Sequence, residues 1–98
     1  MLINYTVENN KLIISPVGRI DSTTSDEFND VIVNNFKADN DGLIIDFKDV
    51  DFISSKGLRI IVSIYKVLNG RTMEIINANE SVIDVFKVSG LLKVLDVK

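Results

Sequence analysis

The sequence predicts a mixed α/β fold with a mostly parallel sheet of four to five strands and three to four helices. Short apolar segments typical of strands alternate along the chain with longer segments of helical periodicity. The order is β-β-α-β-α-β-α, followed by a final strand or docked tail. Two β-α-β units imply a parallel core joined by right-handed crossovers. The chain has 98 residues without a linker or repeat, so residues 1–98 form one domain.

The N-terminal segment reads as an antiparallel hairpin. Three apolar residues alternate with polar ones and predict a half-buried strand: Ile3, Tyr5 and Val7. Asn9 and Asn10 tolerate positive φ and therefore predict the turn. The second strand starts at Leu12, and Pro16, which has no N–H to donate, is expected near that strand's end or at a sheet edge.

Three helices follow from apolar periodicity and from residues that favour helix ends. The first runs from Ser25 to Phe36, and Thr24 and Glu27 match a capping box before it. The second starts after Ser54-Ser55, is expected to be buried around much of its girth, and ends at Asn69-Gly70. The third is capped by Ser81 and closed by Gly90.

Two further strands are predicted between the helices. Residues 43–47 form a nearly continuous apolar run, which indicates a strand buried on both faces. Residues 48–53 read as a loop held by two buried side chains, Val50 and Phe52. Residues 73–76 form the next strand.

The composition excludes several classes of function. The chain contains no Cys, no His and no Trp. Disulfides, thiolate chemistry, a Ser-His-Asp site and a typical zinc site are therefore excluded. The net charge of −3 argues against nucleic acid as a direct partner. No signal peptide and no apolar run of membrane-spanning length stands out, so we expect a cytoplasmic protein that does not bind membranes.

Polar residues gather where the predicted strands end, which is where open α/β sheets form their sites. Asp21 lies in the segment after the second strand, and Ser54 and Ser55 lie at the start of the second helix. A helix N-terminus presents free N–H groups that suit an anion, including a phosphoserine. Lys56 and Arg59 could also meet a phosphate. The plainer interpretation is that the serines only cap the helix, the cations are solvated, and Asp21 belongs to a turn.

Four stretches together resemble the STAS domain family, and in particular the anti-sigma factor antagonists of bacteria. Residues 50–59, Val-Asp-Phe-Ile-Ser-Ser-Lys-Gly-Leu-Arg, resemble the family's signature. Gly18-Arg19-Ile20-Asp21 with Thr24, the strand at 43–47, and Gly90-Leu91 resemble family features in the same order. The resemblance spans essentially the whole chain and implies the STAS fold.

The resemblance also implies a function. Members of that family bind an anti-sigma factor that is also a serine kinase, and this binding frees a sigma factor. The kinase phosphorylates one serine, binding is lost, and a serine phosphatase resets the protein. The matching serine here is Ser55, and Asp21 matches an acid close to it. The implied partner-binding residues are Asp21, Ser54, Ser55, Lys56, Gly57 and Arg59.

Two residues depart from the family's pattern. Ser54 stands where well-known members have Asp, and Lys56 stands where many have Ser, Thr or Ala. These departures leave open a STAS domain that is not phosphorylated. One such alternative is a binding subunit of a lipid-transport ABC complex. The oligomeric state is also left open.

Other classes fit the sequence less well. Asp46 at a strand end resembles the phosphorylated residue of a response-regulator receiver, but no paired acid follows the first strand to hold Mg²⁺. Ser55 and Lys56 could suggest a Ser-Lys dyad, but adjacent helical residues do not face each other. No phosphate-binding glycine loop is present. We therefore expect no enzyme activity, no cofactor and no metal.

Overall fold

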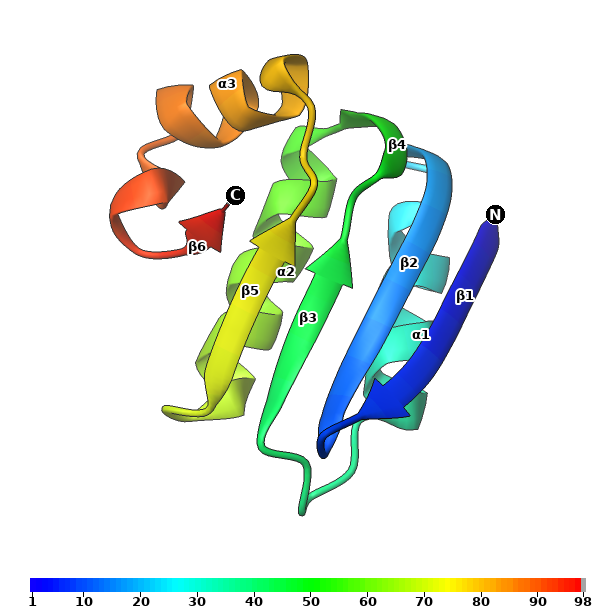
Figure 1. The fold of residues 1–98 in the computed structure, drawn as a ribbon. Coiled ribbons are helices and arrows are strands. Elements are labelled where there is room, and N and C mark those ends of the chain that lie inside the picture. The colour runs from blue at the N-terminus through cyan, green and yellow to red at the C-terminus, as the bar shows by residue number, and fades with distance from the viewer. Residues whose placement is uncertain (98) are drawn as a thin grey trace.

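The computed structural model describes residues 1–97 and has the predicted fold class. The strands are β1 (Leu2–Glu8), β2 (Lys11–Ile20), β3 (Gly42–Asp46), β4 (Asp49–Ile53), β5 (Thr72–Ile76) and β6 (Asp96–Val97). The helices are α1 (Ser25–Asn35), α2 (Ser55–Leu68) and α3 (Glu80–Val88), and η1 (Leu91–Lys93) is a single 3₁₀ turn. Figure 1 shows the sheet in front of α1 and α2, with α3 above it.

The six strands of the described chain form one sheet in the order β1-β2-β3-β5-β6, and β4 pairs with β2 beyond the end of β3. Only β1 is antiparallel to its neighbour. A mixed, mostly parallel sheet is therefore confirmed. The sheet has one strand more than predicted, because residues 49–53, expected as part of a loop, form β4.

β2 changes its parallel partner halfway along its length. Residues 11–14 pair with β3 and residues 17–20 pair with β4. Pro16 lies in the gap between the two ladders, where no parallel strand needs its missing N–H. The expectation that Pro16 marks a strand end or a sheet edge is therefore wrong. Pro16 lies inside β2, at the point where β2 changes its parallel partner and no ladder hydrogen bond from residue 16 is needed.

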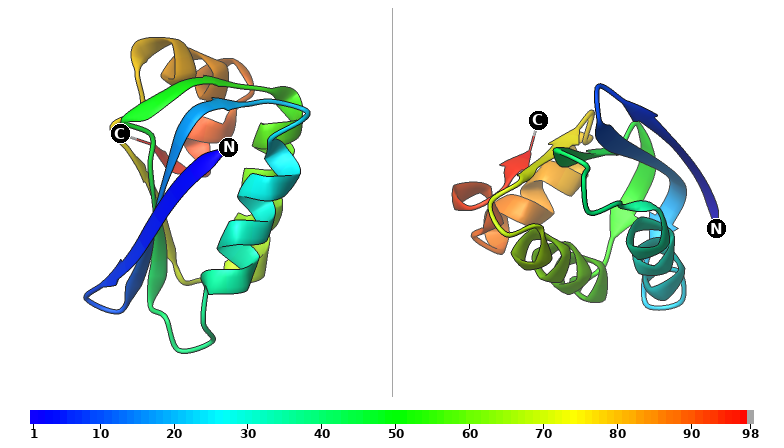
Figure 2. Two further views of the ribbon diagram at one scale, coloured as in Figure 1. Left: turned by 90° about the vertical axis from the view of Figure 1, so that its right-hand side faces the viewer. Right: turned by 90° about the horizontal axis from the view of Figure 1, so that it is seen from below.

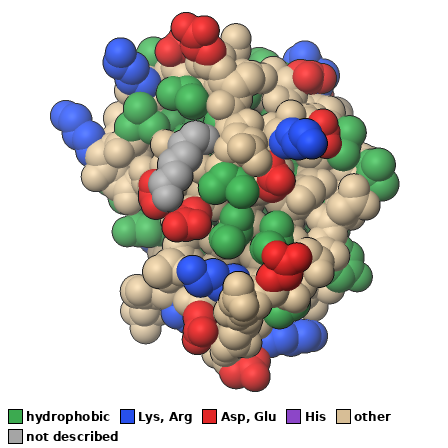
Figure 3. All heavy atoms as spheres, viewed as in Figure 1, with side chains coloured by type: hydrophobic (Ala, Val, Ile, Leu, Met, Phe, Trp, Pro, Cys, Tyr) green, Lys and Arg blue, Asp and Glu red, His purple; other side chains and the backbone are tan. Residues whose placement is uncertain are grey.

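The core lies between one face of the sheet and the helices. Figure 2 shows α1 and α2 on the same side of the sheet. The buried side chains of β2, β3 and β5 alternate with half-buried ones such as Ile13 and Ile44, which lie on the other face. The prediction that residues 43–47 are buried on both faces is wrong, because no helix within residues 1–97 covers the second face. Figure 3 shows that open face, on which charged and apolar side chains are mixed.

Two other burial predictions are also wrong, one for β1 and one for α2. Tyr5 and Val7 on β1 are 56% and 53% exposed, because β1 lies at the sheet edge, where it pairs only with β2. α2 buries one stripe, formed by Gly57, Ile61, Ile64 and Leu68, while Val67 on its outer side is 74% exposed.

The predicted hairpin turn between β1 and β2 is confirmed, since Asn9 and Asn10 have φ values of 51° and 64°.

Candidate functional site

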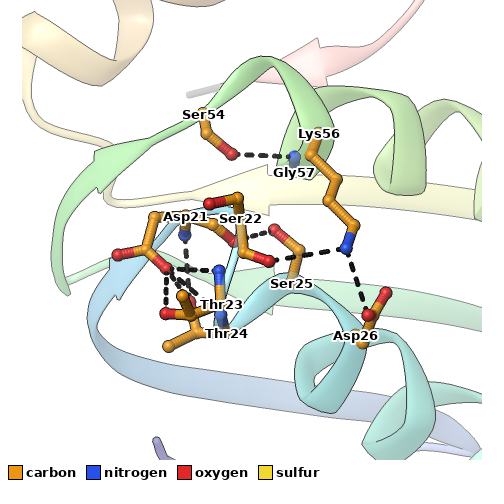
Figure 4. Close-up of polar contacts among 9 residues, drawn as sticks. All are labelled: Asp21, Ser22, Thr23, Thr24, Ser25, Asp26, Ser54, Lys56 and Gly57. Carbon is orange, nitrogen blue, oxygen red and sulfur yellow. Dashed lines mark hydrogen bonds and ion pairs between the residues drawn. The ribbon is translucent and has the colours of Figure 1, made fainter.

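The first turns of α1 and α2 meet at the carboxyl end of the sheet (Figure 4). Lys56 Nζ joins them, lying 3.1 Å from Asp26 Oδ2 and 3.4 Å from the carbonyl oxygen of Ser22. The backbone N–H of Ser54 donates to the carbonyl oxygen of Ile20 at 2.8 Å, which holds the start of α2 against the end of β2. The structure therefore brings the loop that contains Asp21 and the segment from Ser54 to Gly57 into one region, as the sequence predicts.

Asp21 organises the loop before α1. Its Oδ1 accepts hydrogen bonds from the Thr23 hydroxyl at 2.7 Å, the Thr23 N–H at 2.9 Å and the Thr24 N–H at 3.1 Å. The bond from the Thr23 hydroxyl is the largest cause that lowers the pKa of Asp21 from 3.8 to about 2, followed by the backbone bond from Thr23. Asp21 is therefore a charged, preorganised acceptor.

The predicted capping box at Thr24 and Glu27 is wrong. Thr24 is the N-cap residue, but it has a helical backbone (φ −101°, ψ −15°), and its side chain makes no capping bond. Its hydroxyl instead donates to the carbonyl oxygen of Arg19 at 2.6 Å and accepts from the N–H of Asp21 at 2.9 Å. A capping side chain normally needs an extended N-cap residue, so Thr24 closes the preceding loop instead.

Ser54 and Ser55 have different roles at the start of α2. Ser54 is the N-cap, with an extended backbone, and its Oγ accepts from the N–H of Gly57 at 3.1 Å. Ser55 is the first residue of the helix and is exposed. Within residues 1–97 its hydroxyl has no hydrogen-bond partner. Ser54 therefore has a structural role as the helix cap, while Ser55 is exposed to solvent.

Gly57 sets how closely α2 approaches the sheet. A Cβ at this position would lie 2.9 Å from Ile20 Cγ2 and 2.9 Å from Ile53 Cγ1, and both isoleucines belong to the core. Only glycine permits this separation. Gly57 itself is buried, so its role here is to position the first turn of α2.

The two predicted cations point in different directions. Lys56 reaches across to α1 and forms an ion pair with Asp26. Arg59 is exposed, four residues after Ser55, which places it on the same face of the helix. It lines a shallow groove together with Ser55 and Leu58 of α2 and with Ser89 beyond α3. Among the described residues, Arg59 rather than Lys56 remains available to an anion on Ser55.

Sequence reasoning missed an aromatic feature beside the site. The prediction that Phe52 is buried is wrong, since it is 37% exposed. The Arg19 guanidinium lies over its ring, 4.3 Å from the centroid, and Arg19 Nε is 3.8 Å from Asp21 Oδ2. Arg19 and Phe52 are neighbours in the β2–β4 ladder, so the pair could be found only once β4 was recognised as a strand.

The described part of the chain limits what else this region can hold. Residues 1–97 contain no cluster of three or more acidic, His or Cys side chains arranged to bind a metal ion. Over the same residues, no helix is both long and apolar enough to cross a membrane. The functional groups in this region are the exposed hydroxyl of Ser55 at a helix N-terminus and the ionised carboxylate of Asp21 in the adjacent loop.

The comparison with protein families decides the family, because a model of the STAS domain matches residues 3–98. The chain belongs to the STAS domain family. No curated protein matches this STAS domain significantly in sequence.

Solved structures resemble the STAS domain along almost its whole length. A Thermotoga maritima protein named as an anti-sigma factor antagonist is 20% identical, with a TM-score of 0.90, over 97% of this chain and 84% of the other. An anti-sigma factor antagonist from Mycobacterium paratuberculosis is 22% identical, with a TM-score of 0.89, over 98% and 83%. Unphosphorylated SpoIIAA, from Bacillus, is 19% identical, with a TM-score of 0.82, over 99% and 88%. At these identities the likeness shows the shared fold.

Proposed function

We propose that this STAS domain is an anti-sigma factor antagonist. It binds an anti-sigma factor serine kinase in the bacterial cytoplasm, which releases a sigma factor, and it dissociates when the kinase phosphorylates Ser55. A serine phosphatase restores the binding form. The domain acts as a binding protein and as the kinase's substrate, and it needs no catalytic residue of its own.

One observation carries the proposal: of two adjacent serines, only Ser55 has a free and exposed hydroxyl. Ser54 accepts the capping hydrogen bond from Gly57, so modification at Ser54 would break the start of α2. A phosphate on Ser55 would meet the unpaired N–H groups of the first helical turn and the Arg59 side chain one turn later. The fold can therefore carry the modification at Ser55 without strain.

The effect of the phosphate on a partner follows from electrostatics. A phosphate adds a charge of about −1.5 to −2 to a surface that already includes ionised Asp21. Burying that charge in a packed interface is unfavourable, and a loss of about 2.8 kcal/mol weakens binding about a hundredfold. A related observation comes from the neighbours, because SpoIIAA has been solved in a phosphorylated form, which is 18% identical to this chain with a TM-score of 0.74.

The test is phosphorylation by the anti-sigma factor kinase encoded nearest to the gene. The STAS domain is mixed with that kinase, ATP and Mg²⁺, and the intact and peptide masses are measured. We expect one phosphate on Ser55 and loss of the complex. Ser55→Ala should bind without being modified. Ser54→Ala, which keeps Ser55 but loses the cap, is the matched control and should still accept phosphate. A phosphate on any other residue would contradict the proposal.

A second candidate function is a permanent binding subunit of a lipid-transport ABC complex. It rests on the departures of Ser54 and Lys56 from the family's pattern, since both residues adjoin the proposed acceptor and Lys56 pairs with Asp26 of α1. In the same experiment, a stable complex with the kinase that never gains phosphate would favour permanent binding. Co-purification with a transporter ATPase would then identify this alternative.

A further inference from the structure

The outer edge of β1 is an unoccupied strand edge at one end of the strand order. β1 pairs only with β2 among the described residues, and every residue from Asn4 to Glu8 is exposed. Figure 2, viewed from below, shows β1 at the rim of the sheet with no element beyond it. Such an edge is a template for another strand.

The hairpin determines which backbone groups point outward. A two-residue turn with positive φ at both Asn9 and Asn10 makes the flanking pair, Glu8 and Lys11, hydrogen-bonded to each other. Because hydrogen-bonded pairs alternate along an antiparallel ladder, the backbone groups of Ile3, Tyr5 and Val7 face away from β2. Pro16, which lacks an N–H, stands opposite Ile3 and fits a pair that is not hydrogen-bonded.

Nothing in β1 protects this edge. Natural edge strands usually carry lysines, prolines or bulges that prevent pairing. β1 has no charge and no proline between Leu2 and Val7, and its pairing with β2 runs from Leu2 to Glu8 without a shift. Together with the exposed apolar side chains of Tyr5 and Val7, these features mark β1 as a strand that another strand can extend.

We propose that the occupant is a second copy of this chain, paired antiparallel through β1 with Tyr5 at the two-fold axis. Apolar residues lie symmetrically about Tyr5, with Ile3 two positions before it and Val7 two positions after it. The pairing sets Tyr5 opposite Tyr5 and Ile3 opposite Val7, with all these side chains on the helix side of the sheet. The only charged side chain of β1, Glu8, meets Leu2 of the second copy, so no like charges oppose each other.

The dimer leaves the proposed phosphoacceptor site open. β1 pairs with one edge of β2, whereas β4, which leads into Ser55, pairs with the other edge, so β2 separates the outer edge of β1 from the proposed phosphoacceptor (Figure 1). A single pair of short strands buries less area than a permanent dimer needs. The association is therefore concentration-dependent and weak, and it does not depend on the function of Ser55.

Cysteine cross-linking tests the register of the proposed dimer. The chain contains no native Cys, so only the introduced thiols can react. In the proposed dimer, Tyr5→Cys places two thiols on directly opposed residues, about 5.5 Å apart at Cα. Val7→Cys is the matched control, because its side chain is equally exposed but its two copies are offset by four residues, about 14 Å. A short bis-thiol reagent should link Tyr5→Cys and leave Val7→Cys monomeric. Equal linking of both variants would overturn the proposal.

Sedimentation tests the association itself. The wild-type chain should shift toward twice the monomer mass as its concentration rises to about 1 mM, and Tyr5→Lys should weaken this self-association about tenfold or more, because it opposes two like charges. An equimolar mixture of Tyr5→Lys with Tyr5→Glu should recover dimers, since only a symmetric pairing brings position 5 onto itself. A wild-type chain that stays monomeric throughout, or a mixture that does not recover, would refute the dimer.

Discussion

Asp21 and Ser54 both accept hydrogen bonds from backbone N–H groups near the start of a helix, where helical bonds leave those groups unpaired. Asp21 accepts the N–H groups of Thr23 and Thr24, and Ser54 accepts that of Gly57. The difference is charge. Asp21 is a carboxylate whose hydrogen bonds favour its ionised form, whereas Ser54 is neutral at every pH. Acid should therefore affect the loop before α1 more than the start of α2.

The lowered pKa of Asp21 predicts how stability depends on pH. The folded state holds this pKa at about 2 against an ordinary value of 3.8. A carboxyl with a depressed pKa stabilises the fold above about pH 4, and that contribution is lost as the pH falls from about 4 through 2. We expect the difference in unfolding free energy between wild type and Asp21→Asn to shrink over this range, as measured by urea unfolding at each pH.

A titration of Asp21 followed by NMR is the direct check on this prediction. The Thr23 hydroxyl is the largest cause of the shift, so Thr23→Val should raise the pKa of Asp21 toward its ordinary value. Unfolding free energies of wild type and Asp21→Asn that stay parallel from pH 7 to pH 2 would contradict the hydrogen-bonding account of this loop.

At this scale the sequence predicts which residues gather, but not how they divide their tasks. Both Ser54 and Ser55 could be read as a helix start, and only the backbone conformation shows which one caps. Thr24 matches the capping-box pattern, yet its helical ψ of −15° turns the hydroxyl toward Arg19. A capping pattern specifies residue types, whereas the bond depends on dihedral angles that the loop as a whole determines.

At the scale of the element, α3 illustrates the same difficulty. The sequence offers Ser81 as its cap, but the N-cap is Asn79, two residues earlier, and the helix begins at Glu80. Asn79 Oδ1 accepts from the N–H of Val82 at 2.9 Å, while Nδ2 donates to the carbonyl oxygen of Val50 at 3.1 Å. The second bond ties α3 to β4. Local pattern reading could not find it, because β4 is recognisable only from its pairing with β2.

The two candidate caps of α3 give opposite predictions for two similar substitutions. Asn79→Ala should lower the free energy of unfolding by about 1–2 kcal/mol, since it removes the cap and leaves the Val50 carbonyl without this partner. Ser81→Ala, within the exposed first turn, should change it by no more than about 0.5 kcal/mol. Urea unfolding of both variants decides between them, and a larger loss from Ser81→Ala would place the cap where the sequence alone suggests.

At the scale of the whole molecule, apolar periodicity predicts the elements well but not what covers them. The alternation in β1 is the pattern of a half-buried strand, and the apolar run of β3 is that of a strand covered on both faces. The helices α1 and α2, which connect β2 to β3 and β4 to β5, pack on the same side of the sheet, which leaves the other face and the outer edge of β1 open. Hydrophobicity along a strand cannot distinguish a side chain under a helix from one at an open edge, because tertiary packing decides it.

The whole molecule should tolerate negative charge on Ser55 without losing stability. Ser55→Asp adds an acid in the first turn of α2, which contains no other acid, and places it four residues before Arg59. We expect the free energy of unfolding to rise by about 0.3–1 kcal/mol relative to Ser55→Ala, and this gain should fall in high salt.

Arg59→Ala separates the two sources of that gain, the helix terminus and the pair between residues 55 and 59, because it removes the pair and keeps the terminus.

Binding to the kinase should weaken in Ser55→Asp while its urea midpoint holds or rises. Loss of binding together with a lower midpoint would mean that charge at Ser55 acts by unfolding the start of α2. Loss of binding with a maintained midpoint would place the effect at the interface, where a switch that cycles between two folded states requires it.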